Sequence, residues 1–476
     1  MKLSKKGNLI PVYRDIITDM ETPVSAFKKI EGEYSYLLES VEGGEKIGRY
    51  SFLGSDPILM VRSKGNKIEV ISKGKTTKIE GNPIKELKKI LSRYRSVKIK
   101  GLPRFHGGFV GYLSYDIVRH IEKLPDKNPD DLKLPDMQFL LTDTILAFDH
   151  IKHKISIISN VLVEGDAGKA YESAVKKIDA LASKLAKPAK NAGIEAVKGK
   201  ELKLKSNFSR TEFEKIVQRA KTYVESGDVI QVVLSQRLGT KIKGDTFDIY
   251  RLLRTLNPSP YMYYLKFKDM KLIGSSPETM VRLEGNVANV RPIAGTRRRG
   301  ETETEDLSLE GELLSDEKEK AEHIMLVDLG RNDLGRVCKF KSIKINELMT
   351  VEKYSHVMHI VSDITGELRP GKDGFDLIAA AFPAGTVTGA PKIRAMEIID
   401  ELENVRRGPY AGAVGYFDFY GNIDTCITIR TILVKGNDAY VQAGAGIVAD
   451  SVPSKEFEET MNKAGALLKA IELSQR

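Results

Sequence analysis

The order of strand-like and helix-like segments constrains the fold of this chain more than any other feature. The pattern over residues 11–150 predicts short strands separated by glycine-containing turns, with a single helix near its middle. Residues 201–476 mix both kinds of segment, but strands and helices do not alternate one for one as they do in βαβ units. The sequence therefore predicts a mixed, largely antiparallel sheet and the α+β class.

Apolar runs and alternation define the predicted strands, and apolar residues at helical spacing define the predicted helices. The predicted strands span residues 34–40, 50–53, 58–63, 67–72, 107–113, 138–148, 229–237, 262–267, 272–275, 411–419, 426–434 and 439–443. The predicted helices span residues 83–94, 167–185, 317–329, 391–402 and 455–473. A further helix begins after Ser209, because Glu212 completes a capping-box pattern there.

A stretch rich in lysine, alanine and glycine, residues 186–200, is typical of a loop or a domain boundary. It predicts a β-rich N-terminal region over residues 1–200 and a second region over residues 201–476. The sheets of these two regions can interleave.

Composition excludes several classes of protein. Of the 476 residues, 41% are hydrophobic and 29% are charged, which is typical of a soluble globular protein, and no apolar run is long enough to span a membrane. The two cysteines, Cys338 and Cys426, lie far apart, so we expect no disulfide scaffold and a cytoplasmic protein without a secretory signal. The net charge of +10 comes from interspersed lysines and acids without a nucleic-acid-binding motif, and favours an anionic substrate instead.

Two pairs of glutamates have the spacing of neighbours on one face of a helix: Glu319 with Glu322, and Glu456 with Glu459. Magnesium prefers such oxygen ligands, usually one or two carboxylates with waters and substrate oxygens. Acidic residues in a first helical turn also stabilise the helix dipole. The spacing alone leaves both interpretations open.

Three glycine-bearing turns, at 274–278, 385–391 and 444–447, are able to present backbone amides to an anion, although glycines also serve tight sheet corners. Residues 444–449 match a dinucleotide-binding fingerprint in form. Pro453 interrupts the helix that such a site needs, so we reject this interpretation.

Arg430 and His359 are polar residues in segments predicted as apolar strands. A guanidinium in such a place needs a carboxylate, either from a substrate or from a structural partner. A single histidine there is either a satisfied core residue or a catalyst. No serine or cysteine nucleophile with a histidine partner is apparent, so covalent acyl chemistry is disfavoured.

Five segments together resemble the chorismate-utilising enzymes, in the order of that family's motifs. They are residues 274–278 (GSSPE), 291–297 (RPIAGTR), 322–333 (EHIMLVDLGRND), 382–392 (FPAGTVTGAPK) and 443–448 (AGAGIV). The resemblance spans residues 205–470. It implies an open β-sandwich of two sheets with helices outside, and a cleft that binds chorismate and magnesium.

The resemblance also implies roles for individual residues. Glu322 and Glu459 are implied as metal ligands, with Glu319 and Glu456 beside them. The implied catalytic residues are Glu278 as the acid that protonates the leaving oxygen, His359 in the loss of pyruvate, Gln231 and Thr386. The implied substrate-binding residues are Tyr410, Arg430, Gly444, Ala445, Gly446, Ala294, Gly295, Thr296 and Lys463.

Two positions distinguish branches of this family. Members that add water to chorismate carry a lysine in the place of Gln231, where it acts as a general base; an amide cannot, but ammonia needs only to be positioned. Members that form aminodeoxychorismate often carry a nucleophilic lysine in the place of Ala294. The resemblance therefore favours a lyase that makes anthranilate and pyruvate from chorismate and ammonia, for tryptophan biosynthesis. The alternatives are aminodeoxychorismate formation and a non-catalytic ligand-sensing module.

The first half of the chain resembles the N-terminal region of the anthranilate-forming members at residues 36–40, 42–45 and 48–52. This resemblance implies feedback inhibition by tryptophan, bound by Leu38, Glu39, Ser40, Pro260, Tyr261 and Met262. The alternative is that the segment around Leu38 is only a buried strand. Nothing in the sequence resembles a glutaminase, so ammonia is expected from a separate glutaminase subunit in a hetero-oligomer.

Overall fold

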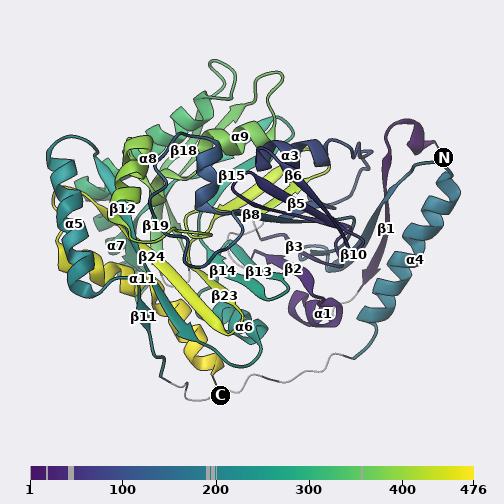
Figure 1. Cartoon of the computed structure of the whole chain (residues 1–476), viewed down its shortest axis with the longest axis horizontal. Coiled ribbons are helices and arrows are strands. Elements are labelled where there is room, and N and C mark those ends of the chain that lie inside the picture. The colour runs from purple at the N-terminus through teal and green to yellow at the C-terminus, as the bar shows by residue number, and fades with distance from the viewer. Residues whose placement is uncertain are drawn as a thin grey trace.

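Two large antiparallel sheets form the centre of the molecule. The computed structural model describes residues 2–17, 20–40, 48–188, 193, 199, 201–354 and 357–475. In these residues the strands form two sheets of 12 strands each, and the neighbouring strands run antiparallel. The helices lie outside the sheets (Figure 1). The predicted α+β class and two-sheet sandwich are confirmed.

The first sheet, sheet A, is ordered differently in space than in sequence. From one edge to the other its strands are β1 (Leu9–Ile17), β10 (Lys154–Leu162), β9 (Thr144–Asp149), β3 (Tyr50–Ser55), β2 (Tyr34–Glu39), β13 (Tyr261–Phe267), β14 (Met270–Ser276), β23 (Thr431–Lys435), β24 (Asp438–Ile447), β12 (Gln231–Lys241) and β11 (Lys205–Ser206). The short β20 (Gly389–Ala390) pairs with β12 off this path.

The second sheet, sheet B, has the same mixed order. Its strands are β17 (Ile293–Arg298), β19 (Val357–Glu367), β16 (Val287–Val290), β15 (Thr279–Glu284), β22 (Ile423–Ile427), β21 (Ala413–Asp418), β7 (Gly108–Leu113), β8 (Met137–Thr142), β4 (Leu59–Lys64), β5 (Lys67–Ser72) and β6 (Lys75–Glu80). β16 and β17 pair with different parts of β19, and β18 (Lys344–Lys353) also pairs with β19.

Both sheets contain strands from both sides of residue 200. In sheet A, β2 pairs with β13, with Leu38 opposite Tyr263. In sheet B, β7 pairs with β21, with Leu113 opposite Ala413. The two regions distinguished in the sequence therefore share two continuous hydrogen-bonded sheets.

Alternation along the central strands fills the space on both faces of the sheets. On β13, Tyr263 and Leu265 face sheet B and join a core that also contains Val414 of β21. Their neighbours Met262 and Tyr264 point to the opposite face, into the core beneath the helices. A sheet buried on both faces explains why these strands are almost continuously apolar.

The helices cover the outer faces of both sheets. They are α1 (Pro23–Ile30), α3 (Pro83–Leu91), α4 (Ala167–Leu185), α5 (Arg210–Glu225), α6 (Thr246–Leu256), α7 (Glu303–Ser315), α8 (Glu317–Gly335), α9 (Gly374–Ala381), α10 (Lys392–Leu402) and α11 (Pro453–Ser474), with short 3-10 turns η1 (Leu3–Lys5), η2 (Tyr115–His120) and η3 (Gly385–Val387). α1, α4, α6 and α11 pack on sheet A, while α3, α8 and α9 pack on sheet B. In the described part of the chain no helix has the length and apolar character needed to cross a membrane.

The predicted elements agree with the structure where the local pattern is strong. α4 and β5 begin and end at the predicted residues. At the start of α5, the Ser209 hydroxyl accepts the Glu212 N–H at 3.3 Å, and the Glu212 carboxylate accepts the Ser209 N–H at 2.7 Å. The predicted capping box is therefore confirmed.

Two predicted strands are wrong in the same way, because each is two strands. Residues 138–148 form β8 in sheet B and β9 in sheet A, separated at Asp143. Residues 426–434 likewise divide into β22 and β23, and Arg430 joins them with a φ of 50°. The prediction that Arg430 lies on a strand is therefore wrong. Arg430 lies in the segment that crosses from one sheet to the other. Positive φ is rare for a residue with a side chain and breaks the strand there.

Several further predictions differ from the structure or lie beyond what it describes. The sequence prediction missed the strands β1, β6, β10, β11, β15, β16, β17, β18 and β20 and the helices α1, α6, α7 and α9. The segment 444–447 was predicted as a turn, but it is the end of β24 and pairs with β12. Residues 42–45 and most of 186–200 lie outside the described residues.

A buried ion pair joins α10 to the strands beneath it. The side chains of Glu403 and Arg407 are 2% and 1% exposed, and their closest atoms are 2.6 Å apart. Arg407 also donates to the carbonyls of Val233 at 2.7 Å and Val387 at 2.8 Å, while the Glu403 carboxylate accepts the N–H and hydroxyl of Ser235, both at 2.8 Å. Both charges are thus fully compensated, which a buried ion pair requires.

We expect Arg407→Met to lower the free energy of unfolding by about 3–5 kcal/mol, because it leaves the Glu403 carboxylate buried without a counter-charge. In the double variant Glu403→Met/Arg407→Met, the free energy of unfolding should fall by less than the sum of the decreases in the single variants Glu403→Met and Arg407→Met. Urea unfolding followed by circular dichroism measures both effects.

The matched control is Arg219→Met. Arg219 and Glu401 are 2.7 Å apart, a similar separation, but they are 59% and 40% exposed, and an exposed pair contributes at most about 1 kcal/mol. If Arg219→Met and Arg407→Met lowered the free energy of unfolding equally, burial would not be the reason that the Arg407 pair matters.

Candidate active site and an adjoining pocket

The paired ends of β12 and β24 form the floor of a polar site. Gln231 lies across Gly446, where an added Cβ would stand 2.3 Å from the Gln231 Nε2 atom. At Gly444 an added Cβ would stand 2.7 Å from the Tyr410 hydroxyl. These glycines therefore allow two polar side chains to lie flat against the strand.

Gln231 links this floor to α8. Its Nε2 atom donates to the Glu322 carboxylate at 3.1 Å. Its Oε1 atom is buried and has no hydrogen-bond partner among the described residues. A buried amide oxygen without a donor is costly, so this atom is prepared to accept a hydrogen bond from a bound molecule.

Arg430 and Lys463 lie beside Gly444. The Lys463 ammonium donates to the Gly444 carbonyl at 3.1 Å and pairs with Glu459 at 2.6 Å. The Arg430 guanidinium donates to the Lys463 carbonyl at 3.1 Å. Within the described residues Arg430 makes no ion pair, so this half-buried cation is available to a carboxylate of a ligand.

Glu278 is a carboxyl that stays protonated near neutral pH. It is 7% exposed and lies between β14 and β15. Burial raises its pKa to about 8, and the nearby Thr386 hydroxyl and the charge of Lys463 offset only part of this effect. The Thr386 Oγ1 atom is itself buried and finds no partner of good hydrogen-bond geometry in the described chain. The protonated Glu278 carboxyl, with Thr386 beside it, can therefore supply a proton to a neighbouring group.

His359, on β19, is held as a neutral imidazole. Its Nδ1 atom lies 2.9 Å from the Gly295 carbonyl and 3.0 Å from the Thr296 hydroxyl. Because a carbonyl only accepts, Nδ1 carries the proton and Nε2 keeps its lone pair. Burial lowers the pKa of His359, and the charge of Arg430 lowers it further, while the Gly295 hydrogen bond opposes both. Ala294 precedes this contact on β17.

The four predicted metal-binding glutamates lie at the starts of α8 and α11. Burial and the charge of Glu322 raise the pKa of Glu319, although Arg297 donates to Glu319 at 3.2 Å. Burial and the charge of Glu459 likewise raise the pKa of Glu456, and the charge of Lys318 on α8 lowers it. The two helix starts are thus close enough to interact electrostatically.

This donor set fits magnesium better than a metal that needs a complete protein cage. In the described residues no three His, Cys, Asp or Glu side chains converge tightly enough to hold an ion alone. Magnesium needs only one or two carboxylates, with water and substrate completing its shell. The raised pKa values of Glu319 and Glu456 also mark carboxylates that a bound cation would stabilise in their charged form.

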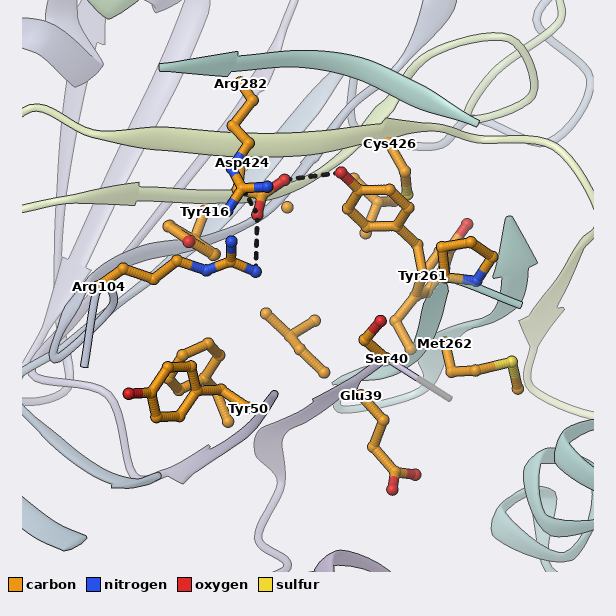
Figure 2. A pocket seen from close by; sticks show the side chains of 16 residues that line it. Glu39, Ser40, Tyr50, Arg104, Tyr261, Met262, Arg282, Tyr416, Asp424 and Cys426 are labelled. Carbon is orange, nitrogen blue, oxygen red and sulfur yellow. Dashed lines mark hydrogen bonds and ion pairs between the residues drawn. The ribbon is translucent and has the colours of Figure 1, made fainter. Parts of the chain in front are cut away.

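A separate pocket of about 50 Å³ lies between the two sheets. It is lined by 16 residues, among them all six that the resemblance assigns to inhibitor binding: Leu38, Glu39, Ser40, Pro260, Tyr261 and Met262. Figure 2 shows Ser40 and Tyr261 beside the cavity, while the Glu39 side chain points away from it. The Glu39 carboxylate accepts from Tyr250 and from Arg254 at 3.2 Å instead, because alternate residues of β2 face opposite sides of the sheet.

Sequence reasoning missed the polar residues on the other wall of this pocket. The Arg104 guanidinium lies 3.3 Å from the Asp424 carboxylate, and Tyr416 and Tyr50 complete this wall (Figure 2). No local pattern marks these residues as a group, since they come from segments that only the sheet pairing brings together. Arg407, which stacks on the Tyr410 ring at 5.6 Å, was missed for the same reason.

Comparisons with known proteins identify the family of this chain. A family model described as chorismate binding enzyme matches residues 33–469. Anthranilate synthase component 1 of Acetivibrio thermocellus is 53% identical, with 99% of this chain and 97% of that protein covered. The crystal structure of anthranilate synthase component I from Streptococcus pneumoniae TIGR4 is 37% identical, with a TM-score of 0.81 over 95% of this chain and 99% of that chain.

A more distant structure shares the fold. The menaquinone-specific isochorismate synthase from Escherichia coli is 18% identical, with a TM-score of 0.71 over 99% of this chain and 97% of that chain. The match to the family model and the identity to the first relative extend over nearly the whole chain. The chain therefore belongs to the chorismate binding enzymes and, within them, to the family of anthranilate synthase component 1 chains.

Proposed function

We propose that this chain is a cytoplasmic lyase that converts chorismate and ammonia into anthranilate and pyruvate. The observation that carries the proposal is Gln231, a buried amide at the floor of the site whose oxygen has no hydrogen-bond donor among the residues that the structure describes. An amide cannot deprotonate water, but it can hold ammonia, which is already a nucleophile. Together with the identity to anthranilate synthase component 1 chains, this favours amination over hydration.

Gln231 would position the nucleophile. Its Nε2–H donates to Glu322, which fixes the orientation of the amide, and its Oε1 atom is then free to accept an N–H of ammonia. The nitrogen lone pair is left to attack C2 of the chorismate ring. Arg430, Tyr410 and Lys463 would hold the substrate carboxylates beside this position.

Glu278 would protonate the leaving group. As the C–N bond forms at C2, both ring double bonds shift by one position, to C1=C6 and C4=C5, and the C4 hydroxyl leaves with the Glu278 proton as water. A pKa of about 8 keeps this carboxyl protonated at neutral pH. A cavity of about 50 Å³ beside Glu278 and Thr386 has room for the departing water, which needs about 10–15 Å³.

His359 would complete the reaction. Its unprotonated Nε2 atom is able to take the proton from C2 of the aminated ring. The C3–O bond then breaks, the ring becomes aromatic, and pyruvate leaves as its enolate, which gains a proton at its methylene carbon. The lowered pKa of His359 keeps the imidazole in the neutral form that this step needs.

Magnesium and a partner subunit complete the proposal. Glu322 and Glu459 would hold the metal, with Glu319 and Glu456 beside them, and the bound ion would polarise the ring carboxylate of chorismate. The relatives' designation as component 1 supports a further subunit, and a glutaminase is the partner that would supply ammonia. Tryptophan would bind in the pocket between the sheets and inhibit the enzyme, because the six residues implied for that role line it.

The product identifies the reaction. Chorismate, magnesium and ammonium should yield blue-fluorescent anthranilate and an equal amount of pyruvate when mixed with the purified chain, and nothing when ammonium is omitted. Aminodeoxychorismate without pyruvate would refute the proposal in favour of the related synthase. Ligand binding without any turnover would instead indicate a sensing module.

The pH dependence tests Glu278. An acid catalyst acts in its protonated form, so kcat/KM for chorismate should fall as pH rises through about 8, the pKa of Glu278. Rates must be expressed per concentration of un-ionised ammonia, which also changes with pH. Glu278→Gln should lower kcat about 10²–10⁴-fold and abolish this decline.

Glu284→Gln is the control for the Glu278 variant. Glu284 is the last residue of β15, the strand that begins directly after Glu278, but its side chain is 58% exposed. This change should leave both the rate and the pH profile as they are. A Glu278→Gln variant with full activity would exclude Glu278 as the acid.

Metal binding tests the glutamates. Glu322→Gln should weaken magnesium binding by at least about tenfold, measured by calorimetric titration in the presence of chorismate and by the magnesium concentration that gives half of the full rate. Glu317→Gln, at an 88% exposed position in the first turn of the same helix, is the matched control. An unchanged affinity after Glu322→Gln would remove it from the ligand set.

A further inference from the structure

A short chain of hydroxyls connects the pocket between the sheets with the segment that carries Glu278. Tyr261 lines the pocket, and its hydroxyl donates to the Asp424 carboxylate at 2.8 Å. The same oxygen is 3.0 Å from the Thr279 hydroxyl. Since the single Tyr261 proton is used on Asp424, Thr279 is the donor in the second bond. Figure 2 shows Tyr261 and Asp424 joined across the top of the cavity.

Thr279 is covalently next to Glu278, so any shift of Thr279 moves the acid. Sheet pairing is irregular at this point, because the register of β15 against β22 slips between Thr279 and Val281. Such a bulge redirects side chains and is common beside active sites. On the other side, the Glu278 carbonyl accepts the Ile427 N–H at 3.0 Å. Glu278 is therefore held both by β22 and, through Thr279, by Tyr261.

The pocket end of this chain carries charges that a ligand can rearrange. Asp424 is 5% exposed, and its carboxylate lies 3.3 Å from Arg104 and 3.9 Å from Arg282. The Nε atom of Arg104 is buried and without an acceptor among the described residues. A ligand carboxylate would satisfy this atom and compete with Asp424 for the guanidinium. Asp424 would then rely more on the Tyr261 hydroxyl.

We infer that Tyr261 and Thr279 are positioning residues that transmit occupancy of this pocket to Glu278. The inference rests on the proposed function, in which an amino acid fills the pocket and Glu278 is the acid. It adds the connection between them: a ligand that engages Arg104 changes the hydrogen bonds of Asp424 and Tyr261, and Thr279 passes the shift to the neighbouring carboxyl. The distance covered is two side-chain hydrogen bonds and one peptide unit.

The test separates binding from inhibition. Thr279→Val keeps the shape of the side chain and removes the hydroxyl, whereas Thr279→Ser keeps the hydroxyl and is the matched control. L-tryptophan is the probe. Because the chain contains no Trp of its own, indole fluorescence on the two sides of an equilibrium-dialysis membrane gives the amount of bound tryptophan without a contribution from protein indole. The rate of anthranilate formation is measured at saturating tryptophan on the full chain with magnesium and ammonium.

Thr279→Val should bind tryptophan within about threefold of the unaltered affinity, yet keep at least about tenfold more activity at saturation. Thr279→Ser should behave as the unaltered chain in both measurements. Tyr261→Phe, which removes the other hydroxyl of the link, should also retain activity at saturating tryptophan. It gives the answer if Thr279→Val does not fold.

The outcomes are distinguishable. Full inhibition of Thr279→Val and Tyr261→Phe at saturating tryptophan would overturn the inference and leave the proposed function intact. Loss of inhibition in Thr279→Ser as well would also overturn it, since that variant keeps the hydroxyl. If tryptophan neither binds nor inhibits the unaltered chain, the feedback part of the proposed function fails, and this inference fails with it.

Discussion

The buried pair of Glu403 and Arg407 is the interaction on which the arrangement of the site most depends. Two charges removed from water must satisfy every donor and acceptor they carry, and here the partners are backbone groups of separate segments. Ser235 and Val233 belong to β12, and Val387 follows Thr386 in η3. Arg407 also stacks on the rings of Tyr115 and Tyr410 at 4.9 and 5.6 Å. One guanidinium thus fixes the strand that bears Gln231, the loop that bears Thr386 and a substrate-binding tyrosine.

Around this fixed centre, the site combines an acid and a base that burial keeps neutral. The pKa of Glu278 is raised and that of His359 is lowered, because in each case burial disfavours the charged form. At neutral pH the same desolvation therefore leaves one group with a proton to give and the other with a lone pair to receive one. Enzymes commonly assign acid and base roles in this way.

Much of the fold follows from local sequence, and the failures have a common cause. Strong periodicity and capping signals predicted α4, α5 and β5 correctly, because these features act within one element. The errors at Asp143 and Arg430 arise where the chain leaves one sheet for the other within a few residues. Such a crossing depends on the partner strands, and an unbroken apolar run gives no sign of it. β1 and β10 were missed although they pair along their whole length.

For the site, the sequence predicted individual residues but not the contacts between them. Its residues were named from recognisable motifs, and the structure places Gln231 against Glu322 and Gly446, and Glu278 beside Thr386. The motifs did not show which distant segments of the chain contact one another. Arg104 and Asp424 meet on one wall of the pocket only because sheet B brings β22 close to the residues before β7. Similarly, the orientation of the Glu39 carboxylate follows from the strand register, which the sequence alone does not specify.

The sharing of both sheets by the two halves of the chain also bears on how the protein is made. β7 pairs on one side with β8, which follows soon after it, but its other edge must wait for β21, about 300 residues further along. At roughly 5–20 residues per second, a ribosome takes on the order of 15–60 s to supply that strand. During this time an apolar strand edge stays open to pairing with other nascent chains. Growth temperature and the supply of chaperones should therefore govern the yield of soluble protein more strongly than its final stability does.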